Sequence, residues 1–390
     1  MIDRIEIFIT ELPTRVRRTF SSGSYDTGEP RDALGKPVLV KIYADGVFGY
    51  GQIRPISPGH FVADTAHSVV AAITDIYGPL LLGKRPSDLE AIQEDFNGRL
   101  AGNPAARAVI DIALHDLIGK QLGVPVASLL GGVCEATIPI EWSVSMADDT
   151  GVMVAEAKRA VDEFGIRVLC LKAAGRGGWR QDVKNFEAVR KAVGDDIVIG
   201  VDPNTGWTFS ETIAYMHAIR PLDLGYMEQP TERRDLHALA AIHSQACGVP
   251  IMADESLFTL TDAFALAEAR AVDVFCIKLY KVGGLSPARK IAAVAEAANI
   301  QLNLGGLAVL SQTEAAASAH FCAATPAKRM FGAAEFAFAL NTVGTDPLVP
   351  EPGLVLKDGA VALPMGPGLG ITIDEDALSR HTIHRVAVPR

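Results

Sequence analysis

The sequence lacks the features of a secreted, membrane-bound or nucleic-acid-binding protein. Its five cysteines are scattered, odd in number and form no CxxC pair, which is typical of reduced thiols in a cytosolic protein rather than a disulfide framework. No apolar run approaches the roughly 20 residues that cross a bilayer. The first residues, MIDRIEIFIT, lack the basic start of a signal peptide, and no basic run stands out at a net charge of -10. We therefore expect a cytoplasmic protein that binds neither membranes nor nucleic acid.

The chain is long enough for two domains, and its first part predicts α+β structure. Apolar residues make up 49% of the 390 residues, which supplies a substantial core and argues against disorder. Periodic apolar patterns predict three strands and then three helices, with the turn signal Asp45-Gly46 between the last two strands. The strands are Ile5–Leu12, Pro37–Ala44 and Val47–Gln52, and the helices are Ala63–Leu82, Pro86–Leu100 and Pro104–Gln121.

After Gly131-Gly132, short apolar runs alternate with amphipathic segments at spacings of about 25 to 30 residues. Continuous apolar strands separated by helices predict an α/β fold with a parallel sheet covered on both faces. Eight such units favour a (β/α)₈ barrel with room for one irregular strand, and no GxGxxG supports the alternative, an open doubly wound sheet. The predicted strands are Ile138–Ser145, Val168–Lys172, Ile197–Asp202, Leu224–Glu228, Pro250–Asp254, Val274–Lys278, Gln301–Leu304 and Met330–Glu335.

Three segments therefore make up the predicted fold. Residues 1–130 form an α+β domain, residues 131–345 form the barrel, and residues 346–390 return to the N-terminal domain. The last segment is rich in glycine and proline, and short strands are predicted at Gly353–Leu356 and Val361–Leu363.

Most of the predicted barrel strands end in a charged residue. Asp202, Glu228 and Asp254 close three successive strands, and the C-terminal strand ends form the active-site face of such a barrel. Three carboxylates brought together repel one another, and a hard divalent cation relieves the repulsion. All-oxygen ligation favours Mg²⁺, or Mn²⁺, over Zn²⁺. The alternative, in which each acid caps a helix or pairs with a surface lysine, explains three successive strand ends less well.

Two lysines stand on either side of these acids. Lys172 closes the second predicted strand and Lys278 the sixth, so the two amines are expected on opposite sides of a closed barrel. A nearby divalent cation lowers the pKa of a lysine, so each amine is a candidate base near neutral pH. The competing interpretation makes each lysine a salt-bridge partner of the acids.

Several segments, in their order and spacing, carry a specific resemblance over nearly the whole chain. They are ALHDLIGKQLGVPVASLLGG (Ala113–Gly132), VDPNTGW (Val201–Trp207), MEQP (Met227–Pro230), ADES (Ala253–Ser256), IKLYKVGGL (Ile277–Leu285) and PGLGITID (Pro367–Asp374). With these segments the chain resembles the enolase superfamily, in the muconate lactonizing enzyme subgroup of the mandelate racemase/muconate lactonizing enzyme family. The resemblance implies an α+β capping domain, completed by the C-terminal segment, over a modified TIM barrel with an irregular start.

The resemblance also implies roles for the strand-end residues. Mg²⁺ is expected on Asp202, Glu228 and Asp254, Lys172 matches the second lysine of the family's KxK motif, and Lys278 matches the lysine of strand six. The hydrogen next to a carboxylate is weakly acidic, and a metal bound to that carboxylate stabilises the enediolate charge that forms on its removal. One lysine then removes the proton, and the opposite lysine delivers or holds one.

Other positions extend the pattern or depart from it. Asn204 and Glu255, beside the first and third acids, are candidates for supporting the metal ligands or the substrate. The first position of KxK is Cys170, which we interpret as core packing with a smaller chance of tuning Lys172. Asn303 lies where mandelate-racemase relatives carry a catalytic histidine nearby, which supports the two-lysine subgroup. Glu335 resembles the acidic group on strand eight of muconate lactonizing enzymes.

Substrate specificity is expected from two loops of the capping domain, Phe20–Pro30 and Gln52–His60. Arg54 is a candidate for binding a second carboxylate or a hydroxyl through two hydrogen bonds, with a surface ion pair as the alternative. Phe20 and Tyr25 are candidates for a lid over the substrate.

The leading functional hypothesis is an isomerase acting on a small carboxylate, either a muconate-type cycloisomerase or a racemase/epimerase. The alternative is a dehydratase that eliminates hydroxide from a hydroxy acid of hydroxyproline or succinylbenzoate type. A non-catalytic barrel for binding or assembly is a third reading, but no metal ligand or strand-end lysine is replaced, which disfavours it. We also expect the protein to form a homo-oligomer.

Overall fold

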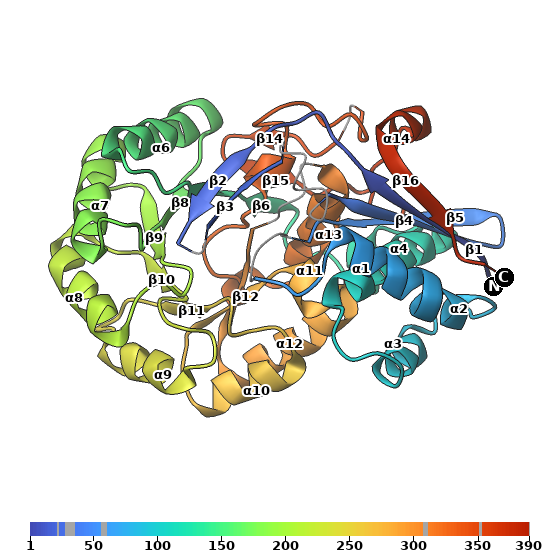
Figure 1. Cartoon of the computed structure of the whole chain (residues 1–390), viewed down its shortest axis with the longest axis horizontal. Coiled ribbons are helices and arrows are strands. Elements are labelled where there is room, and N and C mark those ends of the chain that lie inside the picture. Colours follow the sequence, from blue (N-terminus) through green and yellow to red (C-terminus); the bar gives the residue numbers. More distant parts are fainter. Residues whose placement is uncertain (22, 28–35, 56–60, 307–310, 351–352, 390) are drawn as a thin grey trace.

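The computed structural model shows an α+β cap beside a barrel ringed by helices (Figure 1). It describes the chain except residues 22, 28–35, 56–60, 307–310, 351–352 and 390. The predicted fold class, a TIM-type barrel with an α+β cap, is confirmed. No helix in the described part of the chain combines the length and the apolar character needed to cross a membrane.

The cap is built on an antiparallel sheet with the strand order β16-β1-β4-β5. Asp45 and Gly46 have φ of 54° and 80°, the left-handed pair that a two-residue hairpin turn requires. Helix α4 (Pro104–Leu122) lies against β5, where a Cβ on Gly49 or Gly51 would stand 2.2 or 2.0 Å from a helix carbonyl oxygen. The sheet strands are β1 (Ile2–Thr10), β4 (Val38–Ala44), β5 (Val47–Ile53) and β16 (Thr382–Ala387).

Shorter elements complete the cap. The helix predicted near residues 63–82 is interrupted by a π-helical segment, Ile73–Tyr77. A hairpin in the loop that precedes β4 was not predicted, and it reaches toward the barrel. These elements are β2 (Arg17–Phe20), β3 (Gly23–Asp26), α1 (Ala66–Ala72), α2 (Gly78–Leu81), α3 (Leu89–Asn97) and α5 (Val126–Leu129).

The barrel sheet is parallel and runs in sequence order, β7-β8-β9-β10-β11-β12-β13, in the described residues. Seven of the eight predicted strands are present there. Their bounds are β7 (Glu141–Val144), β8 (Val168–Lys172), β9 (Val198–Asp202), β10 (Tyr226–Glu228), β11 (Ile251–Ala253), β12 (Val274–Ile277) and β13 (Gln301–Leu304).

The barrel closes through a segment that is not a regular strand, so the prediction of a strand at Met330–Glu335 is wrong in its local structure. The amide of Glu335 donates to the Leu304 carbonyl oxygen at 2.9 Å, and the amide of Glu141 donates to the Ala334 oxygen at 2.9 Å. The first predicted strand also divides at Pro139, which has no N–H to donate. Its first part, β6 (Thr137–Pro139), leaves the barrel and pairs with β15.

Helices cover the outside of the barrel (Figure 1). Thr208 and Thr259 begin two of them with capping boxes, in which each threonine side chain accepts a backbone N–H of the first turn. Helix α13 is buried along its whole length and contacts β5 of the cap. The helices are α6 (Thr150–Phe164), α7 (Trp179–Val193), α8 (Phe209–Ile219), α9 (Leu236–Gln245), α10 (Leu260–Glu268), α11 (Leu279–Val282), α12 (Leu285–Ala298) and α13 (Gln312–Ala323).

The C-terminal segment returns to the cap, as expected. Strand β16 forms the outer edge of the cap sheet beside β1, and it and the helix before it were not predicted. The remaining elements of the segment are β14 (Leu356–Lys357), β15 (Ala360–Ala362) and α14 (Glu375–His381). Outside this segment, short 3₁₀ turns lie at Arg220–Leu222, Ala327–Arg329 and Ala337–Ala339.

Side chains fill the interior of the barrel below the strand ends. A Cβ on Gly200 would lie 2.1 Å from the ring of Tyr226, so this glycine leaves the room that the ring occupies. The interior cluster consists of Val168, Cys170, Tyr226, Met252, Val274, Cys276 and Ala333. Because the interior is filled, a substrate can reach only the C-terminal mouth of the barrel.

Candidate active site

Five charged residues that the sequence places at strand ends lie together at the barrel mouth. Lys172, Asp202 and Glu228 are the last residues of β8, β9 and β10, while Asp254 and Lys278 directly follow β11 and β12. The three carboxylates and Lys278 are buried, and the Lys172 side chain is 13% exposed. We call these five residues the strand-end ring.

Each lysine of the ring forms an ion pair with one carboxylate. Lys172 Nζ donates to Asp202 Oδ2, and Lys278 Nζ donates to Asp254 Oδ2 at 2.5 Å. Burial, the largest single cause, lowers the pKa of both lysines, but the surrounding acidic groups, led by Asp202 and Asp254, together outweigh it and raise the pKa well above its usual value. The carboxylates therefore keep both amines protonated, whereas a divalent cation on the same carboxylates acts in the opposite direction.

Glu228 differs from its two neighbours because no lysine or arginine of the described residues forms an ion pair with it. Its partner is the thiol of Cys170, with Sγ 3.8 Å from Oε2. Burial and then the charge of Asp202 raise the pKa of Glu228 well above its usual value. The ring thus contains a buried carboxylate that Lys172 and Lys278 compensate only in part, through their charge and without an ion pair.

A third lysine, Lys281, completes the ring and was missed by sequence reasoning. It is fully buried, and its ammonium group donates to Asp254 Oδ1 at 2.6 Å, the Asp254 carbonyl oxygen at 2.7 Å and the Cys276 carbonyl oxygen at 2.9 Å. Burial raises the pKa of Asp254, but Lys278 and then Lys281 outweigh it and hold that pKa well below its usual range. The one-turn helix α11, which follows Lys278, returns Lys281 to the strand ends.

The loops after β9, β10 and β11 are fixed by amide side chains. The predicted pair Asn204 and Glu255 is in contact, with Asn204 Nδ2 donating to Glu255 Oε1 at 3.2 Å, and the Asn204 amide donates to Asp202 Oδ1 at 2.7 Å. Gln229, which was not predicted, accepts the amides of Asp254 and Ser256 at 3.0 Å each. Burial, and then the charge of Asp254, raise the pKa of Glu255 to about 8.

A second carboxylate pair lies near Lys172. Glu335 comes close to Gly306, where a Cβ would lie 2.6 Å from its Oε2. Glu141 on β7 is buried and was not predicted, because the sequence pattern placed it inside an uninterrupted strand. Burial and then the charge of Glu335 raise the pKa of Glu141 to about 8.

The β2–β3 hairpin of the cap contacts barrel loops at one side of the mouth. Ser21 Oγ, in the turn between β2 and β3, donates to the Asn204 carbonyl oxygen at 2.9 Å. The Thr19 amide donates to Ser145 Oγ at 2.9 Å, and the Met146 amide donates to the Thr19 oxygen at 3.0 Å. Arg54 directly follows β5 and is buried, which argues against the alternative of a surface ion pair at this position. Parts of both specificity loops, residues 28–30 and 56–60, lie outside the described residues.

The donor set at the mouth fits a hard divalent cation. Two groups of three residues have donor atoms that, within each group, all lie within 4.8 Å of one another. Both groups contain Glu228. One group adds Asp202 and Cys170, and the other adds Asp254 and Cys276. Mg²⁺ binds carboxylate oxygens of this kind. Bound here, it would be a cationic partner for Glu228, which forms no ion pair with a described residue.

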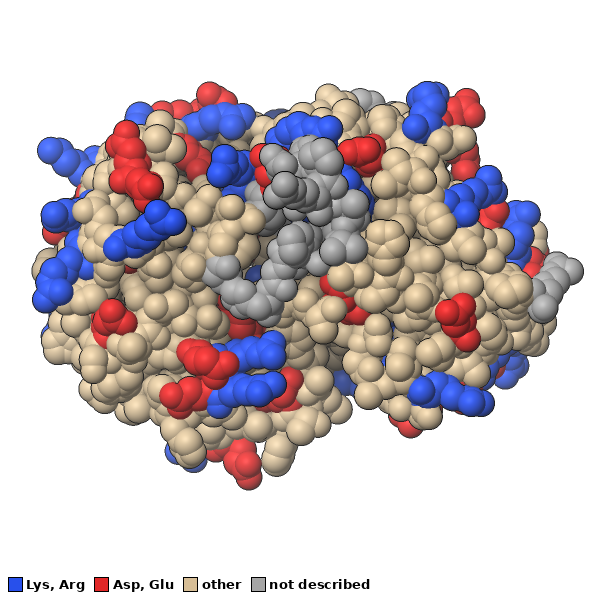
Figure 2. Space-filling model, viewed as in Figure 1, with Lys and Arg blue, Asp and Glu red and all other residues tan. Residues whose placement is uncertain are grey.

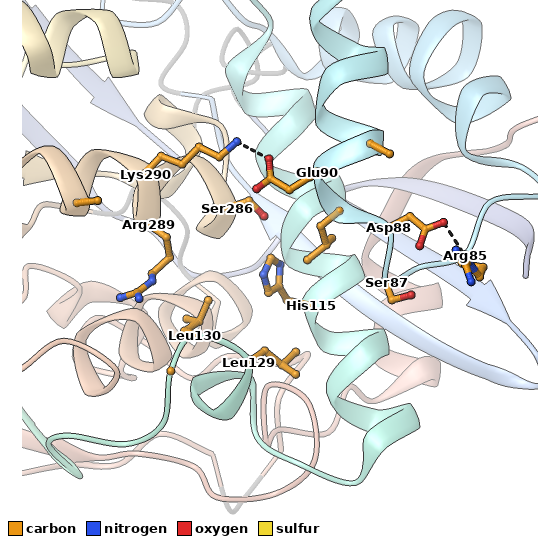
Figure 3. A pocket seen from close by; sticks show the side chains of 14 residues that line it. Arg85, Ser87, Asp88, Glu90, His115, Leu129, Leu130, Ser286, Arg289 and Lys290 are labelled. Carbon is orange, nitrogen blue, oxygen red and sulfur yellow. Dashed lines mark hydrogen bonds and ion pairs between the residues drawn. The ribbon is translucent and has the colours of Figure 1, made fainter.

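An open groove lies away from the barrel mouth, between α3 and α4 of the cap and α12 of the barrel (Figure 3). Its volume is about 940 Å³, and an ion pair of 2.6 Å between Lys290 and Glu90 spans it. His115 and Arg289 also line it, but no residue of the strand-end ring does. On the face in Figure 2, basic and acidic side chains of the described residues are interspersed. The strand-end ring is therefore the candidate reaction centre.

Two protein-family models match this chain. Residues 33–131 match the family described as mandelate racemase / muconate lactonizing enzyme, N-terminal domain, and residues 152–377 match the enolase C-terminal domain-like family. The chain belongs to the enolase superfamily. As a member of the muconate lactonizing enzyme subgroup, it is an enzyme of the isomerase class.

Individual relatives agree over almost the whole length. Chloromuconate cycloisomerase of Cupriavidus necator is 33% identical over 354 residues, covering 88% of this chain and 91% of that protein. The crystal structure of N-succinyl Arg/Lys racemase from Bacillus cereus has a TM-score of 0.90, with 30% identity and 100% of each chain covered. A dipeptide epimerase from Cytophaga hutchinsonii, solved with Mg and the dipeptide D-Ala-L-Val, has a TM-score of 0.88, with 26% identity and 100% of each chain covered.

Proposed function

We propose that this enzyme removes the proton next to the carboxylate of a small substrate, with Lys172 and Lys278 as the two acid–base groups. The observation that carries the proposal is their placement. The lysines follow β8 and β12, three strands lie between them, and the carboxylates occupy those three strand ends. A substrate held at the carboxylates would therefore have one amine on each side.

We propose Mg²⁺, with Mn²⁺ as a substitute, as the cation bound by Asp202, Glu228 and Asp254. Bound there, it would stabilise the negative charge that develops on the substrate's carboxylate oxygens. The relative solved with Mg supports this assignment. The role of the protein is to hold these carboxylates in place. Asn204 holds Asp202, and Gln229 and Lys281 hold Asp254, through the hydrogen bonds described above.

The lysines act as a pair. One amine in its neutral form takes the proton from the substrate, and the ammonium group opposite can return a proton to the other face, which inverts the centre. In a cycloisomerase the same groups act on one face only, and the second lysine stabilises charge. The relatives' names include both kinds of reaction, so the substrate class we propose is a small carboxylate that reacts at its α carbon, which loses and regains a proton in racemisation and gains one in cycloisomerisation.

The proposal is tested by deuterium incorporation in D₂O with Mg²⁺. The substrates are a chloromuconate, both enantiomers of an N-succinyl amino acid, and a dipeptide, and the product is followed by NMR. We expect deuterium at the α carbon, and Lys172→Ala or Lys278→Ala should each slow exchange from one enantiomer by about 10³-fold, within the range for general bases. Lys158→Ala, on an exposed ion pair of α6, is the control. Full exchange in both active-site variants would overturn the proposal.

The same samples discriminate the alternative. A dehydratase would release water from a hydroxy acid, so a product lighter by one water in mass spectrometry would replace the proposed isomerisation.

We further propose that the domain boundaries lie at residues 130 and 345. We also propose that the protein is a cytoplasmic homo-oligomer that does not bind nucleic acid. Size-exclusion chromatography with light scattering tests the oligomer.

A further inference from the structure

A layer of two thiols lies beneath the strand-end ring. Cys170 on β8 and Cys276 on β12 are two residues before Lys172 and Lys278, so their side chains point into the barrel on the same side. Both are fully buried. Each lies with two carboxylates in a group whose donor atoms are within 4.8 Å of one another.

The group of Cys170 is close to the dimensions of a metal site. Cys170 Sγ is 3.8 Å from Glu228 Oε2, and Asp202 supplies the third donor from the strand between them. Ligands about 2.3 Å (sulfur) and 2.0 Å (oxygen) from a tetrahedral ion lie roughly 3.5 Å apart. Small side-chain shifts would therefore bring these three donors onto one ion.

The group of Cys276 is less available. Both oxygens of Asp254 already form ion pairs, Oδ1 with Lys281 and Oδ2 with Lys278. The Cys276 thiol is also confined, because a Cβ on Gly305 would lie 2.3 Å from its sulfur. A cation near Cys276 would meet two ammonium groups in ion pairs with Asp254. At the Cys170 group, one lysine of the described residues, Lys172, forms an ion pair with Asp202 Oδ2, and the Asn204 amide donates to Asp202 Oδ1 at 2.7 Å.

Polar atoms without a close partner next to Cys170 also point to a ligand. The Tyr226 hydroxyl lies near Cys170 and Glu141 and interacts with both, but neither this hydroxyl nor Glu141 Oε2 has a hydrogen-bond partner of good geometry among the described residues. Tyr226 and Glu141 are 1% and 2% exposed. Buried polar atoms of this kind normally have a partner, and a water on a metal ion at Cys170 would be one.

We propose that Cys170, Asp202 and Glu228 form a site for a thiophilic divalent cation such as Zn²⁺. Such an ion displaces the thiol proton and binds N/O/S sites more tightly than Mg²⁺ does. Because the site shares Asp202 and Glu228 with the proposed Mg²⁺ site, Zn²⁺ excludes Mg²⁺ and blocks the enzyme. A lysine at position 170 would place an ammonium group in this site, so the cysteine is what opens it to the cation.

The test uses metal-stripped, full-length protein and two matched variants, Cys170→Ala and Cys276→Ala. Zn²⁺ affinity is measured by competition with a coloured chelator. We expect a loss of about 100-fold in Cys170→Ala and under about 3-fold in Cys276→Ala, since only the first removes a soft ligand. Mg²⁺ affinity, measured by calorimetry, should change under about 3-fold in both, because Mg²⁺ takes oxygen ligands.

Co²⁺ provides a second readout that does not depend on affinity. A cobalt–thiolate bond gives a near-ultraviolet charge-transfer band, which should be present in the wild type and in Cys276→Ser and absent in Cys170→Ser. Unchanged Zn²⁺ affinity in Cys170→Ala, or a band lost with Cys276 instead, would overturn the proposal. Circular dichroism confirms that each variant is folded. Both readouts use no substrate, so their failure leaves the proposed reaction standing, and failure of deuterium exchange leaves this site standing.

Discussion

The two sides of the strand-end ring carry the same pair of residues, a lysine and an aspartate, in different surroundings. On the β11–β12 side, Asp254 has two ammonium partners, and the pKa of its carboxyl is held low. On the β8–β9 side, Asp202 has one, and burial leaves its carboxyl with a raised pKa. Lys281 supplies the extra cation on the first side, whereas both sides have a cysteine below the lysine, Cys276 on the first and Cys170 on the second. The first side is electrostatically complete, and the second keeps an excess of acid.

The largest effect should come from removing the extra cation. Lys281→Met leaves Asp254 with one ion-pair partner and removes the hydrogen bonds that the ammonium group donates to two carbonyl oxygens. We expect the free energy of unfolding to fall by about 3–5 kcal/mol, the usual cost of breaking a buried ion pair. Urea denaturation measures it, with Lys290→Met as the control, because Lys290 forms a solvent-exposed ion pair with Glu90. Equal losses in the two variants would contradict the asymmetry.

A smaller effect is expected from the acid excess on the other side. The pKa of Glu141 is raised to about 8, so the native state holds a proton that the unfolded chain loses near its ordinary value. Stability contributed by this group is present at low pH and is lost as the pH rises through about 8. The free energy of unfolding of Glu141→Gln, relative to that of the wild type, should therefore rise by about 1–3 kcal/mol between pH 5 and pH 8. Parallel curves of unfolding free energy against pH would refute this.

The smallest effect should come from the Asn204 side chain, which makes fewer hydrogen bonds than Gln229, the other amide at the ring. Gln229 makes four hydrogen bonds around Asp254, to Asp254, Ser256 and Thr231, whereas the Asn204 side chain makes one, to Glu255. At about 1 kcal/mol for each net hydrogen bond, Gln229→Ala should cost more stability than Asn204→Gly, which keeps the left-handed backbone at position 204. Thermal denaturation ranks the two, and the reverse order would show that the amides do not follow this asymmetry.

The sequence predicted the strand-end ring because strand ends in a parallel barrel share one edge, so charges such as Asp202 and Glu228 can be placed from spacing alone. It did not predict Lys281, whose position depends on the one-turn helix after Lys278. Glu141 was hidden because the predicted strand was unbroken, whereas Pro139 divides it. These residues are defined by where the chain turns, and apolar periodicity does not record turns of one or two residues.

Structure that depends on contacts between distant parts of the chain is harder still to predict from the sequence. Strand β16 has a partly exposed, polar pattern and becomes a strand because β1 offers it an edge. The irregular segment before Glu335 pairs with β7 and β13, which compensates for its lack of local strand character. The hairpin of β2 and β3 depends on Ser145 and Asn204 of the barrel. In each case tertiary contacts override local propensity.

The pairing of β16 with β1 has a consequence for the order in which the protein is made. Strand β1 keeps one unpaired edge until residues 382–387, which are synthesised after the barrel, have left the ribosome. An exposed strand edge is a template for pairing with other chains. The whole barrel is thus translated while the cap remains open on that side, and a chain that stops before Thr382 never closes it.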